Sequence, residues 1–472
     1  MTVRDEVAGE MAADLLVIGG GMAGMTAAAY SAHQGLKVIV LEKASEIGGN
    51  ALISGGAVWT VPSMQVFTEQ CPRGDIALGE TLLSELPQAI EWLRGIDLEV
   101  EERPSVLGYG SGIGLDMPSF FTRCRRMVEA VRGAVAVHQS VEQLLTSHGQ
   151  VVGARTVESG QRVDIKAPVT LLATGGFQGN PSLLRRYCGR NGPDLLLRAK
   201  PYSTGDGMKL ALSVGAALAG DMGCFYGHLI TWPLSEFLPK DFRRYLLFSS
   251  AGGVLLDMDC NRFVDESLGD HVSAQAVSQL GVPRTILVLD EHARMTAEVH
   301  GRRADEGLIE AARIGANVAV APTLDTLAHL ITGWGFGGAN LVRTIEEFNA
   351  ELAEERVGRV PRHQSRNQLT TPPFYAIEGK PAITFTQGGI RIDRQARVLD
   401  SQGRPRPGLY AAGADVGGAY NGGYAGGLSL ACVFGIQAAR AAIAKSVAVS
   451  HTAAEEVGRQ SDEAGQLAWK DR

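Results

Sequence analysis

A glycine turn near the N-terminus constrains the fold of this chain more than any other feature. The apolar run Leu15–Ile18 leads directly into Gly19, Gly21 and Gly24, which form a G-x-G-x-x-G pattern. The first glycine allows a tight turn, the second lets the backbone approach a pyrophosphate, and the third lets a helix pack closely on the strand. A helix start here offers N–H groups and a positive dipole end to phosphates. The segment therefore predicts a strand–turn–helix unit that binds a dinucleotide.

The residues that follow complete this unit. A second apolar strand, 37–41, ends in Glu42, about twenty residues after the glycines, where an acidic side chain binds ribose hydroxyls. Two more glycine turns follow, at 48–49 and 54–56, and a third, at 173–176, ends another apolar strand. These additional turns fit a cofactor that is longer and bulkier than NAD.

Three further motifs lie far apart in the sequence: ATGG at 173–176, NRFVDE at 261–266 and PGLYAAG at 407–413. With the glycine unit they cover nearly the whole chain, and they resemble the flavoprotein superfamily of fumarate reductase and succinate dehydrogenase, including its soluble ketosteroid dehydrogenase branch. The resemblance implies an α/β fold with a Rossmann-type (GR2-like) FAD-binding domain, discontinuous in sequence, and an inserted α+β capping domain. It implies non-covalent FAD, because residues 50–52 read NAL and lack the histidine that membrane-bound members bond to the flavin.

The resemblance also places the cofactor contacts. They come from the glycine turns, the second strand, a hairpin strand and the C-terminal signature. Asp415 stands one residue after Ala414, where the family usually has a glutamate near the flavin ribitol, and we expect a small shift to bring it there. The predicted FAD-binding residues are Gly19, Gly21, Met22, Ala23, Gly24, Glu42, Lys43, Ala44, Gly48, Gly49, Asn50, Ser54, Gly55, Gly56, Val141, Thr174, Gly175, Gly176, Asp206, Asp415, Leu428 and Ser429.

A chain of 472 residues suggests more than one folding unit. Residues 1–226 alternate strands and helices, with a hairpin over 135–141 and 151–157, and form the first part of the FAD-binding domain. Residues 227–368 carry amphipathic helices near 304–314, 324–331 and 341–355, and correspond to the capping domain. Residues 369–446 return to the FAD-binding domain and end in an apolar helix over 428–443, and residues 447–472 form a polar tail.

Composition limits the partners. The net charge is −7 with both signs scattered, so we expect no nucleic-acid or anionic membrane partner. No uninterrupted apolar run approaches a membrane span, and residues 1–12 lack the apolar stretch of a signal peptide, which predicts a cytoplasmic protein. The six cysteines form no C-x-x-C pattern, so we expect reduced structural thiols, with no haem, iron–sulfur or other metal site.

The chain has one strand–G-x-G-x-x-G unit. A second glycine cluster, at 333–338, sits between two helical patterns and is typical of a helix–helix turn. A dedicated NAD(P)H domain is therefore not expected, and electrons must pass to or from an external carrier, oxygen or a partner protein.

The resemblance locates the substrate site and shows what has changed there. Dicarboxylate reductases use two histidines and two arginines. His228 matches the first histidine, but the second falls at Phe385, the proton-donating arginine falls within the sequence SLGDH at 267–271, and the carboxylate-clamping arginine is replaced by Tyr424. A carboxylate without its bidentate arginine loses much of its recognition, so fumarate and succinate are not the expected substrates.

Tyr424 begins the sequence YAGGL, which resembles the stretch with which ketosteroid dehydrogenases hold a ring ketone. Carried over, the Tyr424 O–H and the Leu428 N–H polarise a ketone oxygen. The sequence departs from that pattern at Ala425, which replaces proline, and at Leu428, which replaces glycine. A packing role for Tyr424 is the alternative.

Several side chains are candidates for the base that removes the proton beside the ketone. A phenol has a pKa near 10 and a histidine near 6.5, so histidine needs less tuning at neutral pH. His228 could instead be a buried histidine of the core, and Asp270 and His271 could be solvated residues of the cap. Arg262 and Glu266 are interpreted as a structural ion pair. The candidates are Tyr226, Tyr245, Tyr109, His228, Asp270 and His271.

The first functional hypothesis is an FAD-dependent dehydrogenase that desaturates the C–C bond α,β to a ketone of a cyclic or steroid-like substrate. The alternative is an enoate reductase of a carboxylate other than fumarate, in which His228 binds the substrate and His271 or Asp270 supplies the proton. Two other classes are an aromatic hydroxylase and an electron-transfer flavoprotein. Aromatic hydroxylases carry a glycine–aspartate turn near the C-terminus, and residues 412–415 of this chain lack it. An electron-transfer flavoprotein would need an exposed flavin instead of a capped pocket.

Overall fold

The strand before the glycine turn lies inside a parallel sheet. The computed structural model describes residues 7–158, 160–238, 241, 244–299 and 302–470. Its six-stranded sheet has β2 between β11 and β3, and β11 in turn pairs with β23 from the C-terminal part of the chain. The order is β22 (Arg397–Leu399), β23 (Pro405–Ala411), β11 (Thr170–Leu172), β2 (Leu15–Ile18), β3 (Val38–Leu41) and β7 (Ala134–Ala136). Residues of β2, β3 and β11 are buried throughout, as aliphatic strands covered on both faces are.

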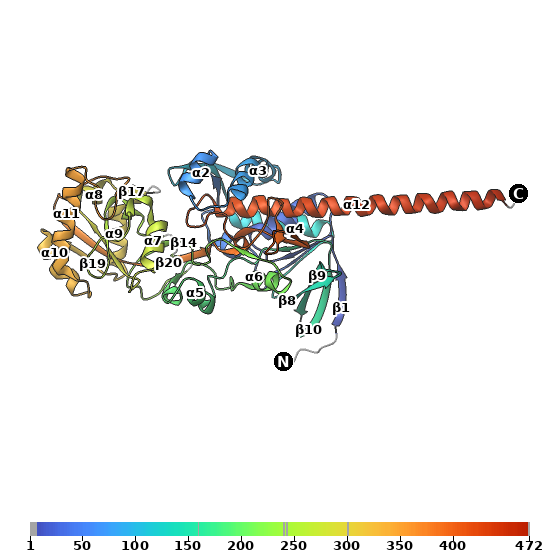
Figure 1. Cartoon of the computed structure of the whole chain (residues 1–472), viewed down its shortest axis with the longest axis horizontal. Helices are drawn as coiled ribbons and strands as arrows, with labels where there is room; N and C mark the ends of the chain where they lie inside the picture. Colours follow the sequence, from blue (N-terminus) through green and yellow to red (C-terminus); the bar gives the residue numbers. More distant parts are fainter. Residues whose placement is uncertain (1–6, 159, 239–240, 242–243, 300–301, 471–472) are drawn as a thin grey trace.

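Helix α1 (Met22–His33) follows the glycine turn and is buried on nearly every side. Its small residues let α12 (Gly427–Lys470) approach closely: a Cβ added at Gly435 would lie 2.6 Å from the Ala23 carbonyl oxygen. In Figure 1, α12 runs along this lobe and continues beyond it to the C-terminus. The predicted apolar helix is confirmed, and the helix extends to Lys470 through the expected polar tail.

Part of α12 passes a composition test for a membrane span. Among the residues that the structure describes, the segment Gly427–Ala448 is long and apolar enough, and 61% of its most apolar stretch is buried inside the protein. Burial against α1 and α3 (Ile76–Gly95) explains that apolar face as core packing.

The expected hairpin forms with a different first strand. β8 (Ser140–Ser147) pairs with β9 (Gln150–Glu158), whereas the residues of β7 join the edge of the parallel sheet beside β3. The hairpin prediction for 135–141 was therefore wrong, because its first residues continue the parallel ladder. The other elements of this lobe are β1 (Val7–Ala12), β10 (Gln161–Lys166), β4 (Ala57–Thr60), β5 (Val100–Val106), β6 (Gly110–Leu115), β13 (Leu218–Ala219), β21 (Gly389–Ile390), α2 (Met64–Gln70), α4 (Met117–Ala130), α5 (Pro181–Tyr187) and α6 (Asp206–Ser213).

A second lobe, the cap, lies at one end of the molecule (Figure 1). Its buried cluster draws on residues 229 to 377, and the boundary expected at residue 368 stays a prediction. The three predicted amphipathic helices are present as α9 (Ala304–Arg313), α10 (Leu324–Thr332) and α11 (Leu341–Ala353), and the glycine cluster lies between the last two. The remaining cap elements are β14 (Phe225–Thr231), β15 (Val254–Leu256), β16 (Thr285–Leu289), β17 (Glu298–Val299), β18 (Arg302–Arg303), β19 (Val318–Ala321), α7 (Asp270–Ser278) and α8 (Glu291–Thr296).

One long strand connects the cap to the cofactor-binding lobe. The first half of β20 (Phe374–Thr386) pairs with β16 and β19 in the cap. Its second half pairs with β14 on one edge and with β12 (Leu196–Leu197) on the other. The strand therefore carries residues from the cap core to the boundary between the lobes.

The NRFVDE motif holds the cap together. Glu266 is fully buried and accepts hydrogen bonds from Arg262 Nη2 (2.8 Å) and the Leu255 N–H (3.0 Å). The predicted ion pair is present, and Arg362, which the sequence did not single out, adds a second guanidinium 3.1 Å from the same carboxylate. Two guanidinium groups around one buried carboxylate indicate that this motif has a structural role in the cap.

The third glycine of the turn gives the first testable prediction. A Cβ at Gly24 would lie 2.0 Å from the Gly19 carbonyl oxygen and 2.9 Å from Val17 Cγ1. We expect Gly24→Ala to lower the free energy of unfolding by about 1–3 kcal/mol and to weaken FAD retention, because helix and strand must separate. The matched control is Gly95→Ala, where nothing lies within 4 Å. Urea unfolding measures both variants, and equal stabilities would contradict this packing role.

Candidate active site

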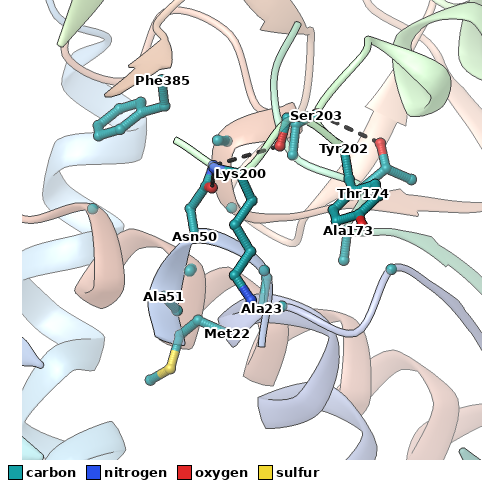
Figure 2. A pocket seen from close by; sticks show the side chains of 18 of the residues that line it. Met22, Ala23, Asn50, Ala51, Ala173, Thr174, Lys200, Tyr202, Ser203 and Phe385 are labelled. Atoms are coloured by element: carbon teal, nitrogen blue, oxygen red, sulfur yellow. Dashed lines mark hydrogen bonds between the residues drawn. The ribbon is translucent and has the colours of Figure 1, made fainter. Parts of the chain in front are cut away.

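A cavity extends from the glycine turn of α1 to aromatic side chains on β14 and β20. Figure 2 shows Lys200 reaching toward Met22 and Ala23 in this cavity, with Phe385 and Thr174 on opposite sides of the view. Most predicted cofactor residues line it. They are Gly19, Gly21, Met22, Ala23, Glu42, Lys43, Ala44, Gly49, Asn50, Ser54, Gly55, Val141, Thr174, Gly175, Asp206 and Leu428.

The remaining predicted cofactor residues do not line the cavity. Glycines among them serve close packing: a Cβ at Gly56 would lie 2.1 Å from the Leu115 oxygen, and one at Gly176 would lie 2.2 Å from Thr386 Oγ1. Ser429 Oγ is buried and donates to the Trp59 carbonyl (2.6 Å). The set outside the cavity is Gly24, Gly48, Gly56, Gly176, Asp415 and Ser429.

The two ends of the G-x-G pattern differ in the space around them. Gly19 has φ +109°, and a Cβ there would lie 2.2 Å from the Ala173 oxygen, so this position needs glycine for the turn itself. A Cβ at Gly21 would meet nothing within 4 Å, because this residue faces the cavity. The open space in front of Gly21 and the start of α1 is where the pattern requires a pyrophosphate.

Glu42 joins the second strand to the glycine turn. Its two carboxylate oxygens accept hydrogen bonds from the Gly20 and Ala44 N–H groups, both at 2.8 Å. The side chain is buried and lines the cavity, so its orientation is fixed beside the space for a ribose.

Two lysines bring charge to the same part of the cavity. Lys43 Nζ lies 2.5 Å from Asp206 Oδ2, and Lys200 Nζ lies 2.6 Å from Glu46 Oε1. Burial alone would raise the pKa of Asp206, but the hydrogen bond and charge of Lys43 outweigh it and the pKa is lowered. Asn50 fastens the loop that carries Lys200, since its Oδ1 accepts the Lys200 N–H (2.7 Å). The fixed carboxylates, the lysines and the open glycine turn suit FAD.

Asp415 does not line the cavity. Its carboxyl group accepts hydrogen bonds from the N–H groups of Thr174 and Gly175 and from the Thr174 hydroxyl, so it ties the C-terminal signature to the ATGG turn. Burial raises its pKa to about 7, even though these hydrogen bonds act in the opposite direction. The Asp415 side chain therefore holds the backbone around Thr174 in place and makes no direct contact with the cavity.

Aromatic rings form the other end of the cavity. Tyr226 and Tyr424 are stacked, with ring centroids 3.9 Å apart and planes at 21°. Phe385 lies 5.3 Å from Tyr226, and Trp59 meets Tyr424 edge-on at 5.6 Å. Trp59 was not foreseen, because nothing in the local sequence connects β4 to the C-terminal signature.

Hydrogen bonds fix the position of Tyr424 and its phenol. Its oxygen accepts the Gly427 N–H at 3.0 Å, and its backbone carbonyl accepts the Tyr109 O–H at 3.1 Å. Burial raises the pKa of Tyr424, with the Gly427 hydrogen bond acting weakly in the opposite direction. The phenol is therefore neutral at physiological pH and has its O–H available as a donor.

His228 and Asp270 form a buried pair next to these rings. His228 Nδ1 lies 2.7 Å from Asp270 Oδ2, which stands in the first turn of α7. Burial would raise the pKa of Asp270, but the His228 imidazole outweighs it and the pKa is lowered. An ionised carboxylate only accepts hydrogen bonds, so His228 Nδ1 donates the hydrogen bond in this pair.

Two other catalytic candidates lie outside the cavity. Tyr245 is buried in a separate apolar cluster with Ile230 and Leu246. His271 lies behind Tyr226, with ring centroids 6.1 Å apart, and burial lowers its pKa. Of the predicted catalytic residues, the structure brings together Tyr226, His228 and Tyr424.

Arg198 is a cavity residue that the sequence reasoning missed. Its Nη1 donates to Thr384 Oγ1 (2.9 Å), and its backbone N–H donates to the Ile383 carbonyl (2.9 Å). The available signal was the sequence RAK at 198–200, shortly before the STGDG stretch that contains Asp206.

Other chemistry has less support. All six cysteines are buried thiols without a disulfide. Across the described part of the chain, His, Cys, Asp and Glu side chains form no group of three that could hold a metal ion.

The pKa of Asp415 predicts a pH-dependent stability. The folded state keeps a proton that the unfolded chain releases between about pH 4 and 7, so the free energy of unfolding falls as pH rises through this window. The slope from this group is at most about 1.4 kcal/mol per pH unit. Asp415→Asn, which resembles the protonated form, should lack this component in urea unfolding at pH 5, 6, 7 and 8. Parallel pH profiles of the two proteins would contradict the prediction.

Comparison with known proteins identifies the family. A profile described as "FAD binding domain" matches residues 14–429. NADH:fumarate oxidoreductase of Klebsiella pneumoniae is 27% identical over 454 residues, which cover 89% of this chain and 46% of the relative, so the chain spans about half of that protein's length. The 4-oxocyclohexanecarboxylate 2-dehydrogenase of Sinomonas cyclohexanicum is 26% identical over 531 residues, covering 88% of this chain and 89% of the relative.

A solved structure shows the same fold. The 3-ketosteroid Δ1-dehydrogenase of Sterolibacterium denitrificans superposes with a TM-score of 0.72 at 18% identity, covering 92% of this chain and 100% of the other. The predicted recognition, fold class and cofactor are confirmed. The chain belongs to the FAD binding domain family and is an FAD-dependent oxidoreductase.

Proposed function

We propose that this protein desaturates the C–C bond next to a ketone of a cyclic substrate. The observation that carries the proposal is the Tyr424 phenol, a neutral donor whose oxygen already accepts the Gly427 N–H. This arrangement suits a ketone oxygen, which gains negative charge when the α carbon loses its proton. The predicted partner N–H of Leu428 belongs to a residue that lines the same cavity.

His228 is the proposed base. Its Nδ1 proton is held by Asp270, so Nε2 takes the α proton and the imidazolium that forms is stabilised by the carboxylate. Tyr226 stacks on Tyr424 and contacts His228 edge-on at 5.0 Å, so it packs between the polarising group and the base. Its pKa is raised far above the ordinary value by burial, so it stays neutral in this scheme.

The reaction balances with the cofactor that the family binds. One C–H bond breaks at the α carbon and its proton goes to His228; one breaks at the β carbon and its hydrogen leaves with two electrons, and a C=C bond forms. Non-covalently bound FAD supplies the two-electron acceptor. An external carrier then removes the electrons. We place the enzyme in the cytoplasm, with a small ketone as substrate and neither nucleic acid nor membrane as a partner.

Two relatives support this direction. The names of 4-oxocyclohexanecarboxylate 2-dehydrogenase and 3-ketosteroid Δ1-dehydrogenase both describe desaturation of a ring that carries a ketone. Tyr424 stands where the dicarboxylate reductases have an arginine that binds a carboxylate, so a neutral carbonyl of the substrate fits better at this position.

Enoate reduction is the second candidate. It is favoured by relatives whose names include an unsaturated acid, such as NADH:fumarate oxidoreductase and the NADH:acrylate oxidoreductase of Vibrio harveyi. The cation Arg198 in the cavity suits an acidic substrate in either direction of the reaction. In this scheme Tyr424 only packs, so its hydroxyl is dispensable while His228 is not.

A variant of the Tyr424 phenol distinguishes ketone desaturation from enoate reduction. Tyr424→Phe keeps the ring stack and removes the O–H, so we expect kcat for ketone desaturation to fall about 100-fold or more. The rate of flavin bleaching after anaerobic mixing with 4-oxocyclohexanecarboxylate measures the step. Tyr245→Phe is the matched control, because that phenol lies outside the cavity and its loss should change little. A near-normal rate for Tyr424→Phe would remove the ketone-polarising role.

The proposed base is tested by variants of His228 and its partner Asp270. His228→Ala should lower kcat about 10²- to 10⁴-fold, and Asp270→Asn should lower it less, because the imidazole remains but its tautomer is no longer fixed. The control is His363→Ala, which breaks another His–Asp pair, 2.6 Å from Asp265 Oδ2, outside the cavity. Equal losses in His228→Ala and His363→Ala would point to destabilisation of the fold instead of lost base catalysis.

A further inference from the structure

The loop that carries Tyr424 has little rigidity of its own. It connects η7 (Gly413–Asp415) to α12 and contains Gly422, Gly423 and Gly426, so its backbone has more conformational freedom than that of an ordinary loop. Gly422 has φ +106°, a conformation that residues with a side chain rarely adopt. The position of the Tyr424 phenol in the cavity therefore depends on the contacts that hold this loop.

Gln387 holds the loop with both ends of its side-chain amide. Its Oε1 accepts the Gly422 N–H (2.5 Å), and its Nε2 donates to the Gly423 carbonyl (2.7 Å). The residue is 4% exposed, so water competes little for these hydrogen bonds. A carboxamide that both donates and accepts in this way replaces the backbone partners that a neighbouring strand would give these two loop residues.

The backbone of Gln387 is fixed as well. Its N–H donates to the carbonyl of Cys224 (3.0 Å), the residue before β14, and its own carbonyl accepts the Gly418 N–H (2.8 Å). Gln387 directly follows Thr386, the last residue of β20. The side-chain amide therefore extends from a fixed point at the end of this strand.

The same strand positions the proposed base. His228 of β14 pairs with Ala382 of β20, while Tyr424 is connected to the end of β20 through Gln387. β20 thus gives the base and the phenol a common support. Loss of the α proton places charge on the ketone oxygen, so both groups must be correctly placed around the substrate at the same time.

We propose that Gln387 is a positioning residue, which holds the Tyr424 phenol in place relative to His228 for ketone desaturation. This inference rests on the proposed function. Gln387 does not line the cavity, so it acts on the substrate only through the loop. The cap adds a longer contact to the same loop, since Gln275 Nε2 of α7 donates to the Gly422 carbonyl at 3.3 Å.

Amide hydrogen exchange tests the hold on the loop without any substrate. The variant Gln387→Met keeps a side chain of similar length, lacks both hydrogen bonds, and is compared with the unaltered FAD-containing protein by mass spectrometry. We expect exchange in the segment 419–427 to become about 10-fold faster. The control is Gln178→Met, because Gln178 is a buried glutamine whose amide has no hydrogen-bond partner among the described residues. Unchanged exchange in Gln387→Met would overturn the proposal.

A double-mutant cycle tests whether Gln387 acts through Tyr424. In anaerobic flavin bleaching with 4-oxocyclohexanecarboxylate, Gln387→Met should lower kcat about 10- to 100-fold and change KM less than about 3-fold. Added to Tyr424→Phe, it should cause a further loss of no more than about 2-fold, because the hydroxyl that it positions is already absent. Losses that multiply in the double variant would assign Gln387 a role apart from Tyr424 and overturn the proposal.

The two measurements also separate this proposal from the proposed function. Faster exchange together with a near-normal rate for Tyr424→Phe would contradict the ketone-polarising role of the phenol and still support the hold of Gln387 on the loop. Slow desaturation by Tyr424→Phe together with a normal rate for Gln387→Met would support ketone desaturation and overturn the positioning role.

Discussion

The parallel pairing of β2, β11 and β23 is the constraint on which the rest of the structure depends. It brings the carboxyl ends of three strands from the beginning, middle and end of the chain to one edge of a sheet. The glycine turn, the ATGG turn and the C-terminal signature therefore meet, and Asp415 fastens the last two together. Ligands bind at this edge in α/β folds because loops and helix starts gather there.

The second organising element is β20, which passes from the cap core to the cavity. Its outer half is held by β16 and β19, while its inner half positions Thr384 and Phe385 and receives β12 and β14 on its edges. The proposed base His228 therefore stands on β14 and Arg198 directly follows β12, so a shift of the cap would move both relative to Tyr424. That coupling is a physical reason for the cap to influence chemistry.

Much of the cofactor site was predictable because its residues obey local rules. The turn at Gly19, the acid at Glu42 and the helix after Gly427 each have a signature within a few residues. The site of chemistry is different, since its side chains meet through long-range pairing. His228 was found by resemblance, its Asp270 partner was only one of several candidates, and Arg198 was missed because only its pairing with β20 places it. The first strand of the hairpin was misplaced for a similar reason, since β7 gains its hydrogen bonds from distant β3.

The central claim is that a ketone is oxidised in front of Tyr424, and a titration of the oxidised yellow protein without oxygen tests it most directly. A panel of cyclic and steroid ketones, with and without a carboxylate, is added while the visible flavin band is recorded. We predict that the band bleaches with at least one cyclic ketone and that the corresponding enone appears in equal amount. No bleaching by any ketone, together with recolouring of the dithionite-reduced protein by an enoate, would contradict the claim and assign the enzyme to enoate reduction.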